Sequence, residues 1–466
     1  MNASSRSRVS ARTTLVAAIA LGCAAGAAHA TTITVTSADD SATFAPCNLR
    51  NAITAINYGN AAMFPGCKAS LHGLFGDNDT IVFAPALANS TITLQQGQLS
   101  NYAPLTIAGS GQVIDAADAS RVLYTIAYLG LSNLTLRGGN AGSGSGGGLY
   151  ADQAFVSLNH VAITSNRATL GGGLAVANGS ASLLFTTVAG NASGGGISVA
   201  ASNVTLKNSA VLDNAASCTS SCAGGIVLTN HATLTATAST IARNTADASG
   251  GSVAGAAHVT ESKLALINST VAENSASGFD AVAGALLETQ STSTAAYGIV
   301  LTNATLAANT ASTANPSAAA VSGGMLLGAS GNARATLANS ILAANSGSVA
   351  AGPIATPDLC LLAGTASIAN SLLGNAQQPL WSGNGNVFSD APGLSVLADH
   401  GGPTPTLALR GDSPAIDAGS NTLALDAASQ PLTTDQRGTA RIVGGRVDIG
   451  AYEFPGDHIF SDRFGG

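Results

Sequence analysis

One short pattern constrains the fold of this chain more than any other feature: an aliphatic residue followed, three positions later, by asparagine. The pattern occurs seven times between residues 131 and 345. Its asparagines are Asn166, Asn191, Asn214, Asn244, Asn274, Asn309 and Asn345. The spacing between successive asparagines varies from 23 to 36 residues, while the offset within each pair is fixed. This combination is typical of a repeated supersecondary unit whose insertions lie in loops.

The residues between two of these asparagines indicate which unit is repeated. In residues 171–191, apolar side chains such as Leu174, Val176 and Leu183 fall mostly at even spacing, which is the period of a strand. Asn178 and Gly179 separate two such runs, and no stretch is long enough for a crossover helix. Two or three short strands per repeat make one turn of a solenoid, with parallel strands roughly 4.8 Å apart. Because such crossovers are right-handed, the pattern predicts an all-β fold, a right-handed parallel β-helix.

Stacked turns would place the seven asparagines in one column. Their side-chain amides could then hydrogen-bond from turn to turn, as a ladder. Each buried bond would contribute on the order of 1 kcal/mol to stability. A second interpretation is that asparagine is used because it tolerates a left-handed turn conformation. The recurrence at one offset favours the ladder.

Residues 1–30 read as a signal peptide. Three arginines precede an apolar run over residues 15–28, and Ala28-His29-Ala30 fits a small-residue cleavage site. No other apolar stretch is long and uninterrupted enough to span a bilayer. We therefore expect a secreted or cell-surface bacterial protein with no transmembrane segment in the mature chain.

The remaining chain divides by composition and pattern. We expect an N-terminal cap and first strands over residues 31–103, β-helix turns over 104–390, a closing region over 391–454 and a short tail over 455–466. The formal net charge is −7 and becomes more negative once the signal peptide is removed. A nucleic-acid partner is therefore not expected.

Five cysteines remain after removal of residues 1–30, in an oxidising compartment. Cys47 and Cys67 flank the first helical segment, and Cys218 and Cys222 lie in the loop of one repeat, so proximity favours these two disulfides and leaves Cys360 unpaired. Metal binding by Cys218 and Cys222 is the alternative, although the sequence offers no matching histidine or second cysteine pair. No cofactor is expected.

A short helix is predicted next to the first turn. Leu49, Ala52, Ile53 and Ile56 fall on one helical face. Such a helix would cover the open end of the solenoid, where unpaired strand edges otherwise invite association. Arg50 on this helix is expected to form a salt bridge within the cap.

Two segments resemble known bacterial families. The stretch Cys47-Asn48-Leu49-Arg50-Asn51-Ala52-Ile53 resembles the "CSLREAI" segment that opens many secreted β-helix proteins, with Asn51 in place of the usual glutamate. A second set of motifs lies near the C-terminus: Ser413-Pro414-Ala415-Ile416-Asp417-Ala418-Gly419, Thr434-Asp435-Gln436-Arg437-Gly438 and Asp448-Ile449-Gly450-Ala451-Tyr452-Glu453. These resemble the choice-of-anchor Q domain. The resemblance implies a β-helix with a surface-attachment tail, and it implies no established activity.

Candidate catalytic and metal-binding residues are few. Asp213, Arg243 and Glu273 each precede a ladder asparagine, so stacking would align them in a column of alternating charge. We expect a surface ion ladder that sets register, with acid–base catalysis as the alternative. Asp77 and Asp79 could hold calcium, although an Asx turn that opens a strand explains them as well.

These observations favour a binding protein, adhesin-like or associated with the cell envelope, that presents a long face to an extracellular polysaccharide or a surface protein. The alternative is a polysaccharide lyase or glycoside hydrolase, because β-helices often host such enzymes. A lyase needs acids that hold calcium and a basic residue, and a hydrolase needs paired carboxylates. No such cluster is evident among the repeats. Aromatic residues make up only 4% of the chain, with a single Trp381, which argues against a sugar-stacking platform.

Overall fold

The computed structural model describes residues 30–41, 46–69, 71–72, 75–76, 78–290, 297–318, 320–328, 333–350, 352–353, 358–375 and 381–456. The expected signal peptide up to residue 29, Asp77, and residues 457–466 of the expected tail lie outside the described residues. No helix in the described part of the chain has the length and apolar character needed to cross a membrane.

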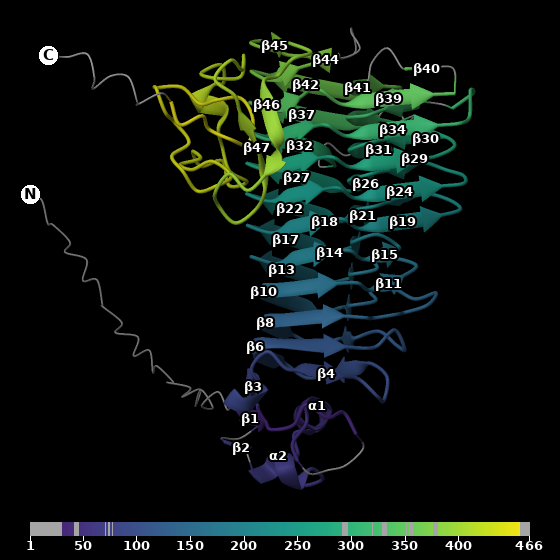
Figure 1. The fold of residues 1–466 in the computed structure, drawn as a ribbon, viewed down its shortest axis with the longest axis vertical. Helices are drawn as coiled ribbons and strands as arrows, with labels where there is room; N and C mark the ends of the chain where they lie inside the picture. Colours follow the sequence, from purple (N-terminus) through teal and green to yellow (C-terminus); the bar gives the residue numbers. More distant parts are fainter. Residues whose placement is uncertain are drawn as a thin grey trace, which may run out of the picture.

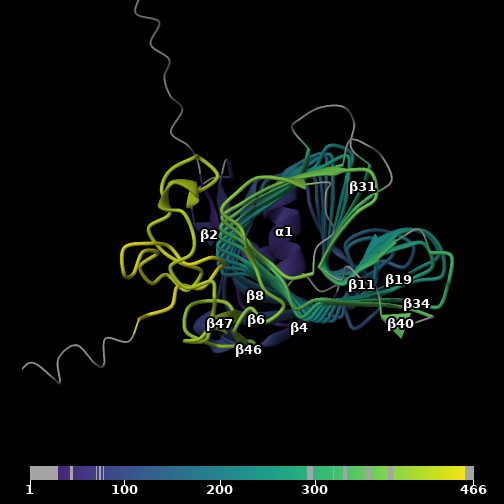
Figure 2. The ribbon, with the colours of Figure 1, turned by 90° about the horizontal axis from the view of Figure 1, so that it is seen from above.

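Each turn of the chain consists of three short strands, and the turns stack into a rod (Figure 1). One turn contains β12 (Leu174–Ala177), β13 (Ser180–Leu184) and β14 (Thr187–Ala189). The next turn pairs with it in parallel, with Leu174 opposite Ile197. Viewed along the rod, the strands outline a closed, roughly three-sided section (Figure 2). The fold is the right-handed parallel β-helix that the repeat predicts.

We call the three sides of the rod the first, second and third faces, in chain order within a turn. The first face contains ten strands: β5 (Leu99–Asn101), β7 (Leu123–Thr125), β9 (Leu149–Asp152), β12, β16 (Ile197–Ala200), β21 (Ile226–Thr229), β26 (Ala257–Thr260), β31 (Leu286–Gln290), β36 (Met325–Leu327) and β41 (Leu359–Leu361). Three long strands bend across the second and third faces: β6 (Leu105–Asp115), β8 (Leu129–Arg137) and β10 (Phe155–Thr164).

In later turns the second and third faces have separate strands. The second face continues with β13, β17 (Asn203–Lys207), β22 (Thr233–Thr237), β27 (Lys263–Ile267), β32 (Gly298–Thr302), β37 (Arg334–Ala338), β42 (Thr365–Ala369) and β44 (Trp381–Ser382). The third face continues with β14, β18 (Ala210–Leu212), β23 (Thr240–Ala242), β28 (Thr270–Ala272), β33 (Thr305–Ala307), β38 (Ile341–Leu342), β43 (Leu372–Leu373) and β45 (Val387–Phe388). We refer to residues 99–189 as the lower turns and to residues 197–373 as the upper turns.

The asparagine ladder is present. Each side-chain amide donates to the side-chain oxygen of the next asparagine at 2.8–2.9 Å, from Asn166 through Asn345. All seven asparagines are at most 5% exposed. The left-handed conformation belongs to the residue before each asparagine, for example Asp213 with φ 55° and Ala308 with φ 58°. The ladder, and not tolerance of a left-handed turn, therefore explains the choice of asparagine.

The N-terminal cap has the predicted form. Helix α1 (Leu49–Asn57) buries Leu49, Ala52, Ile53 and Ile56. Arg50 forms a two-pronged ion pair with Asp40, and both nitrogen–oxygen distances are 2.8 Å. Further cap elements are α2 (Pro65–Ala69), η1 (Pro85–Leu87), β1 (Thr32–Val35), β2 (Leu71–His72), β3 (Asp79–Phe83) and β4 (Thr91–Thr93). The predicted Cys47–Cys67 disulfide joins α2 to the start of α1.

The upper turns insert long loops after the ladder asparagine, and these build a side lobe next to the rod (Figure 2). The lobe has its own small core of alanine and valine, which includes Ala246, Val253 and Val282. One of its sheets contains β19 (Ala215–Cys218), β24 (Thr245–Ala248), β29 (Ser275–Ser277), β34 (Thr310–Thr313), β39 (Ser346–Val349) and β40 (Gly352–Pro353). The other contains β20 (Cys222–Ala223), β25 (Val253–Ala254), β30 (Ala281–Ala283) and β35 (Ala320–Ser322). Below them, β11 (Arg167–Ala168) pairs with β15 (Ala192–Ser193).

The C-terminal region, residues 391–456, corrects one expectation. We expected it to close the rod, but it packs along the third face of the upper turns (Figure 1). Threonines that point outward from this face hydrogen-bond to it: Thr270 donates to Gln436 at 2.6 Å, and Thr305 accepts from the Ala451 N–H at 2.9 Å. The region contains the hairpin β46 (Leu394–Ala398) and β47 (Thr406–Leu409), and η2 (Asn421–Leu423). Polar side chains on the third face, which would otherwise contact solvent, therefore hold the C-terminal region against the rod by hydrogen bonds.

Candidate functional site

The side lobe and the C-terminal region cover faces of the upper turns and leave the lower turns open. On the first face, Leu287 and Leu326 point away from the rod, yet they are fully buried against alanines of the side lobe. On the third face, Thr270 is fully buried under the C-terminal region, whereas Thr135 and Thr187 of the lower turns remain partly exposed. Any extended ligand that binds to the sides of the rod therefore has the lower turns available.

A set of tyrosines gathers on the first face of the lower turns. Tyr124 and Tyr150 are opposite each other on β7 and β9, with ring centroids 5.5 Å apart. Tyr102 lies near them, is 55% exposed and shares a cavity of about 210 Å³ with Tyr58, which is 77% exposed. We call these four residues the tyrosine face. Tyrosine has an apolar ring and a polar hydroxyl, so it suits a surface that contacts ligands with both kinds of group.

The guanidinium of Arg121 lies next to this face. Its central carbon is 5.3 Å from the Tyr150 ring centroid and 5.9 Å from that of Tyr124. Asp152 lies close enough to raise the pKa of both tyrosines, although burial is the larger cause of each increase. The rings of Tyr124 and Tyr150 thus have one cation, Arg121, and one anion, Asp152, next to them.

Two more aromatic pairs bridge neighbouring lower turns. Tyr128 stacks on Phe155 with a centroid distance of 5.7 Å, and His160 stacks on Phe185 at 4.8 Å. His160 and Phe185 have φ of 54° and 48°, at a corner where upper turns have residues such as Asn268. Left-handed backbone is unfavourable for a bulky side chain. Such strain is a known mark of functional positions.

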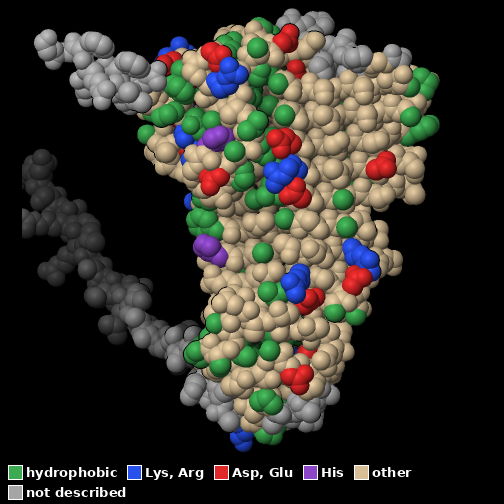
Figure 3. Space-filling model, viewed as in Figure 1, with side chains coloured by type: hydrophobic (Ala, Val, Ile, Leu, Met, Phe, Trp, Pro, Cys, Tyr) green, Lys and Arg blue, Asp and Glu red, His purple; other side chains and the backbone are tan. Residues whose placement is uncertain are grey.

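A shallow groove contains the His160–Phe185 pair. Its cavity of about 710 Å³ is lined by uncharged groups, including Ser110, Asn133 and Thr187. A second cavity of about 420 Å³ also includes Phe185 and extends to the C-terminal region. The view in Figure 3 shows few charged side chains, and uncharged groups cover most of this side of the molecule. The groove therefore offers ring stacking and hydroxyl or amide hydrogen bonding.

The predicted charge column is present in part and lies outside these sites. Arg243 donates from Nε and Nη2 to the two carboxylate oxygens of Asp213, at 2.8 and 3.0 Å. The hydrogen bond to Asp213, with a smaller effect from Glu273, raises the pKa of Arg243. Both side chains of the ion pair are 39–50% exposed, which is the setting of a surface ion pair that contributes little to stability. The aligned charges fit a register-setting role.

The predicted calcium residues are placed only in part. The carboxylate of Asp79 is buried and accepts backbone N–H groups from Thr31 and Gly76, so it joins neighbouring segments of the cap and does not form the expected Asx turn, in which it would accept the N–H two residues later. Asp77 lies outside the described residues. Within the described ranges, no group of three or more His, Cys, Asp or Glu side chains could hold a metal ion. Cys218 and Cys222 are joined in the predicted disulfide, and Cys360 is free.

Two buried titratable groups lie near each other in the upper turns. Burial raises the pKa of Glu288 to about 7, and it lowers the pKa of His258 to about 4. His258 Nε2 is 2.9 Å from the hydroxyl of Thr289, the neighbour of Glu288. One Glu288 oxygen accepts the Arg334 N–H, and the other has no hydrogen-bond partner within the described part of the chain. Their shifted pKa values bear on the pH dependence of stability.

The C-terminal motif residues form a hydrogen-bonded network. Asp435 pairs with Arg437 at 2.7 Å, and Arg441 pairs with Glu453 at 3.0 Å. Asp448 accepts the backbone N–H groups of Asp417 and Phe454. These side chains have their partners within the C-terminal region, and their ion pairs and hydrogen bonds hold its loops together.

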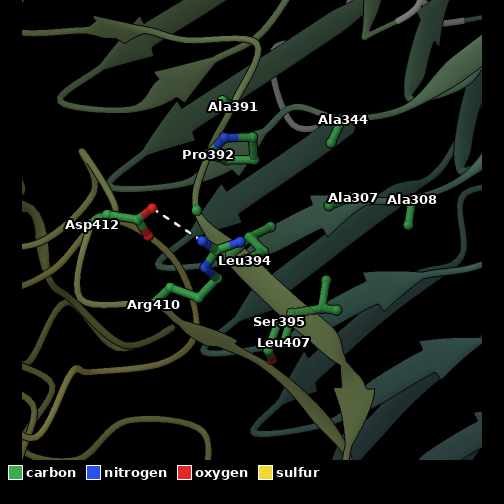
Figure 4. Close-up of a pocket in the computed structure, with 11 residues that line it drawn as sticks. Ala307, Ala308, Ala344, Ala391, Pro392, Leu394, Ser395, Leu407, Arg410 and Asp412 are labelled. Atoms are coloured by element: carbon green, nitrogen blue, oxygen red, sulfur yellow. Dashed lines mark hydrogen bonds and ion pairs between the residues drawn. The ribbon is translucent and has the colours of Figure 1, made fainter.

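A further cavity of about 550 Å³ lies between the β46–β47 hairpin and the rod (Figure 4). Its walls are mostly small, such as Ala307 and Ala344, and an exposed ion pair between Arg410 and Asp412 is at its edge. The cavity lies where the hairpin packs incompletely against the rod. The residues that line it include no convergent set of buried polar groups.

Comparisons with known proteins add little. No family model matches this chain, and no curated protein matches it. Among solved structures, one titled "Crystal structure of pectate lyase Pel9A" is similar with a TM-score of 0.45 and 14% sequence identity, over 91% of this chain and 96% of that chain. The fold assignment rests on the strand register described above.

Sequence reasoning missed the tyrosine face. The overall aromatic content is low, but this average hides the local gathering of rings in residues 102–185. A usable signal existed, because Leu123-Tyr124 and Leu149-Tyr150 repeat the same step in successive turns. Alternation places leucine inside the rod and tyrosine outside it.

Proposed function

We propose that this protein is secreted or displayed on the cell surface and binds an extracellular polysaccharide along its open lower turns, without catalysis. Residues 1–30 and the two disulfides support export, since disulfides persist in oxidising compartments. The C-terminal motifs support a place among the choice-of-anchor Q β-helix proteins.

The observation that carries the binding proposal is the set of three ring pairs on the lower turns: Tyr124–Tyr150, Tyr128–Phe155 and His160–Phe185. Polysaccharide chains present alternating apolar ring faces and hydroxyl groups. Aromatic rings with nearby uncharged hydrogen-bonding groups are complementary to both. Ligand sites of this kind combine apolar contact with a few oriented polar groups.

A binding assay with a panel of neutral and acidic polysaccharides tests the proposal. We expect the wild-type protein to be retarded in affinity electrophoresis by at least one of them. The double variant Y124A/Y150A should bind at least tenfold more weakly, because each aromatic contact is worth on the order of 1 kcal/mol. The variant F279A is the matched control: Phe279 is 55% exposed but lies outside the lower turns, so its loss should leave binding unchanged.

Two results would overturn the proposal. The first is equal binding by the wild type and Y124A/Y150A, or no binding to any polysaccharide with retention of a surface protein instead. The second is multiple-turnover release of shorter chains, with or without calcium, which would establish the lyase or hydrolase alternative.

A further inference from the structure

The guanidinium of Arg121 is a cation that has no carboxylate partner among the residues that the structure describes. Every other described arginine in a comparable half-buried setting, such as Arg50 or Arg437, pairs with an aspartate. Arg121 instead donates to the backbone oxygens of Ser145 and Gly146 and to the Gln98 side chain. Neutral oxygens hold the group in position but leave its charge uncompensated.

The same group lies at the tyrosine face. The distances of 5.3 and 5.9 Å to the Tyr150 and Tyr124 rings are within the range of cation–π contact. Burial lowers the pKa of Arg121, and the two tyrosines partly offset this effect. Arginine nevertheless stays charged at physiological pH. A positive charge is thus fixed next to two half-buried rings on the open side of the rod.

Its hydrogen-bonding capacity is not exhausted. A guanidinium has five N–H groups. The Nε group and one group on each terminal nitrogen have the partners named above. One N–H on each terminal nitrogen therefore remains for a ligand, and a paired donor of this kind matches the two oxygens of a carboxylate or sulfate.

Asp152 completes the arrangement. It lies near both tyrosines, and an ionised carboxylate is an acceptor only. It is therefore suited to sugar hydroxyl groups and unsuited to an anion. The face thus offers a cation at Arg121 that can pair with an anion, two rings that can stack on a sugar, and a hydrogen-bond acceptor for hydroxyl groups at Asp152.

We propose that the tyrosine face binds an acidic sugar unit, whose anionic group pairs with Arg121 while its ring lies against Tyr124 and Tyr150. This inference rests on the proposed polysaccharide binding and names its ligand class. Carboxylate and sulfate share the required chemistry, and the experiment separates them.

The experiment compares polymers that share one backbone and differ in charge. Comparing the affinity for carboxymethylcellulose with that for hydroxyethylcellulose tests recognition of a carboxylate. Comparing the affinity for dextran sulfate with that for dextran tests recognition of a sulfate. We expect the wild type to bind one of the charged polymers about tenfold more tightly than its neutral counterpart. The variant R121Q should lose this ratio while keeping its binding to the neutral polymer.

The matched control is R137Q, which removes a cation from the same turns. Arg137 is 45% exposed and is paired with Asp115, so R137Q should keep the charged-to-neutral ratio. The ratio of the two affinities also separates a loss of recognition from a loss of structure. A loosened Ser145–Gly146 loop would weaken the binding of the charged and the neutral polymer alike. R121K, which keeps the charge but not the paired donor, should recover part of the ratio.

The failures of the two proposals are distinguishable. Binding of charged and neutral polymers with equal affinity, or an R121Q variant that keeps the full ratio, would overturn the acidic-sugar inference while polysaccharide binding stands. Binding of no polymer would overturn the proposed function itself.

Discussion

The side-chain amide of Asn345 donates a 2.8 Å hydrogen bond to the carboxylate of Asp358, so the asparagine column ends on an acid. The same oxygen accepts the Asn345 backbone N–H, and the other oxygen accepts the backbone N–H of Asn375 at 2.7 Å. Each of these three hydrogen-bond partners of the carboxylate is a donor. An acceptor-only group therefore terminates a column whose other members both donate and accept.

The variant D358N should destabilise the protein although it restores the residue type of the column. Its new NH₂ group would face an N–H donor at either position and leave buried groups unpaired. We expect a loss of about 1–3 kcal/mol in the free energy of unfolding, measured by urea denaturation. D412N is the control, since Asp412 is 67% exposed in its side chain, and it should change stability by less than about 0.5 kcal/mol. Unchanged stability in D358N would show that the column does not depend on this end.

Glu288 and His258 should give opposite pH dependences that offset each other. Burial raises the pKa of Glu288 from 4.5 to about 7, so the folded protein keeps a proton that the unfolded chain has released. Burial lowers the pKa of His258 from 6.5 to about 4, so the folded protein lacks a proton that the unfolded chain binds. Between about pH 4.5 and 6.5, the first effect lowers stability as pH rises and the second raises it.

Single variants should expose each effect. E288Q removes the Glu288 effect, so its stability relative to the wild type should decline as pH falls from about 7 toward 4.5. H258N removes the His258 effect, so its stability relative to the wild type should decline as pH rises from about 4 toward 6.5. Each change should reach roughly 2–3 kcal/mol in denaturation experiments across this range. Parallel curves for both variants and the wild type would contradict the assigned burial.

Thiol counting tests the cysteine assignments. A chain that starts at Thr31 should contain one free thiol when unfolded without reductant, because Cys47–Cys67 and Cys218–Cys222 are bridged and Cys360 is free. In the folded protein this thiol should react slowly, since burial raises the pKa of Cys360 and the thiolate is the reactive form. Titration with a chromogenic disulfide reagent measures both quantities. Three or five reactive thiols would contradict the pairing.

Sequence patterns predict the rod because its period is carried by single residue types. Leu174 and Val188 alternate with smaller neighbours, and Asn191 recurs at a fixed offset, so strand, turn and register are all visible. The side lobe is not visible in this way. Its strands consist of small residues such as Ala216, Ser217 and Ala246, whose alternation has little hydrophobic contrast.

The position of the C-terminal region and the exposure of the tyrosine face depend on tertiary contacts. Asn268 and Thr270 look like turn and strand-edge residues in the sequence, and only the folded chain shows that they dock residues 434–436. The tyrosine face depends on which turns stay uncovered. The side lobe and the C-terminal region determine which turns are covered, and the residues around Tyr124 do not.

Hydrogen–deuterium exchange with and without a bound polysaccharide tests most directly where the ligand binds. The account predicts added protection in the lower turns, in peptides that cover residues 121–128 and 149–160, with little change in the side lobe or the C-terminal region. Protection confined to the upper turns, the side lobe or residues 391–456 would contradict it.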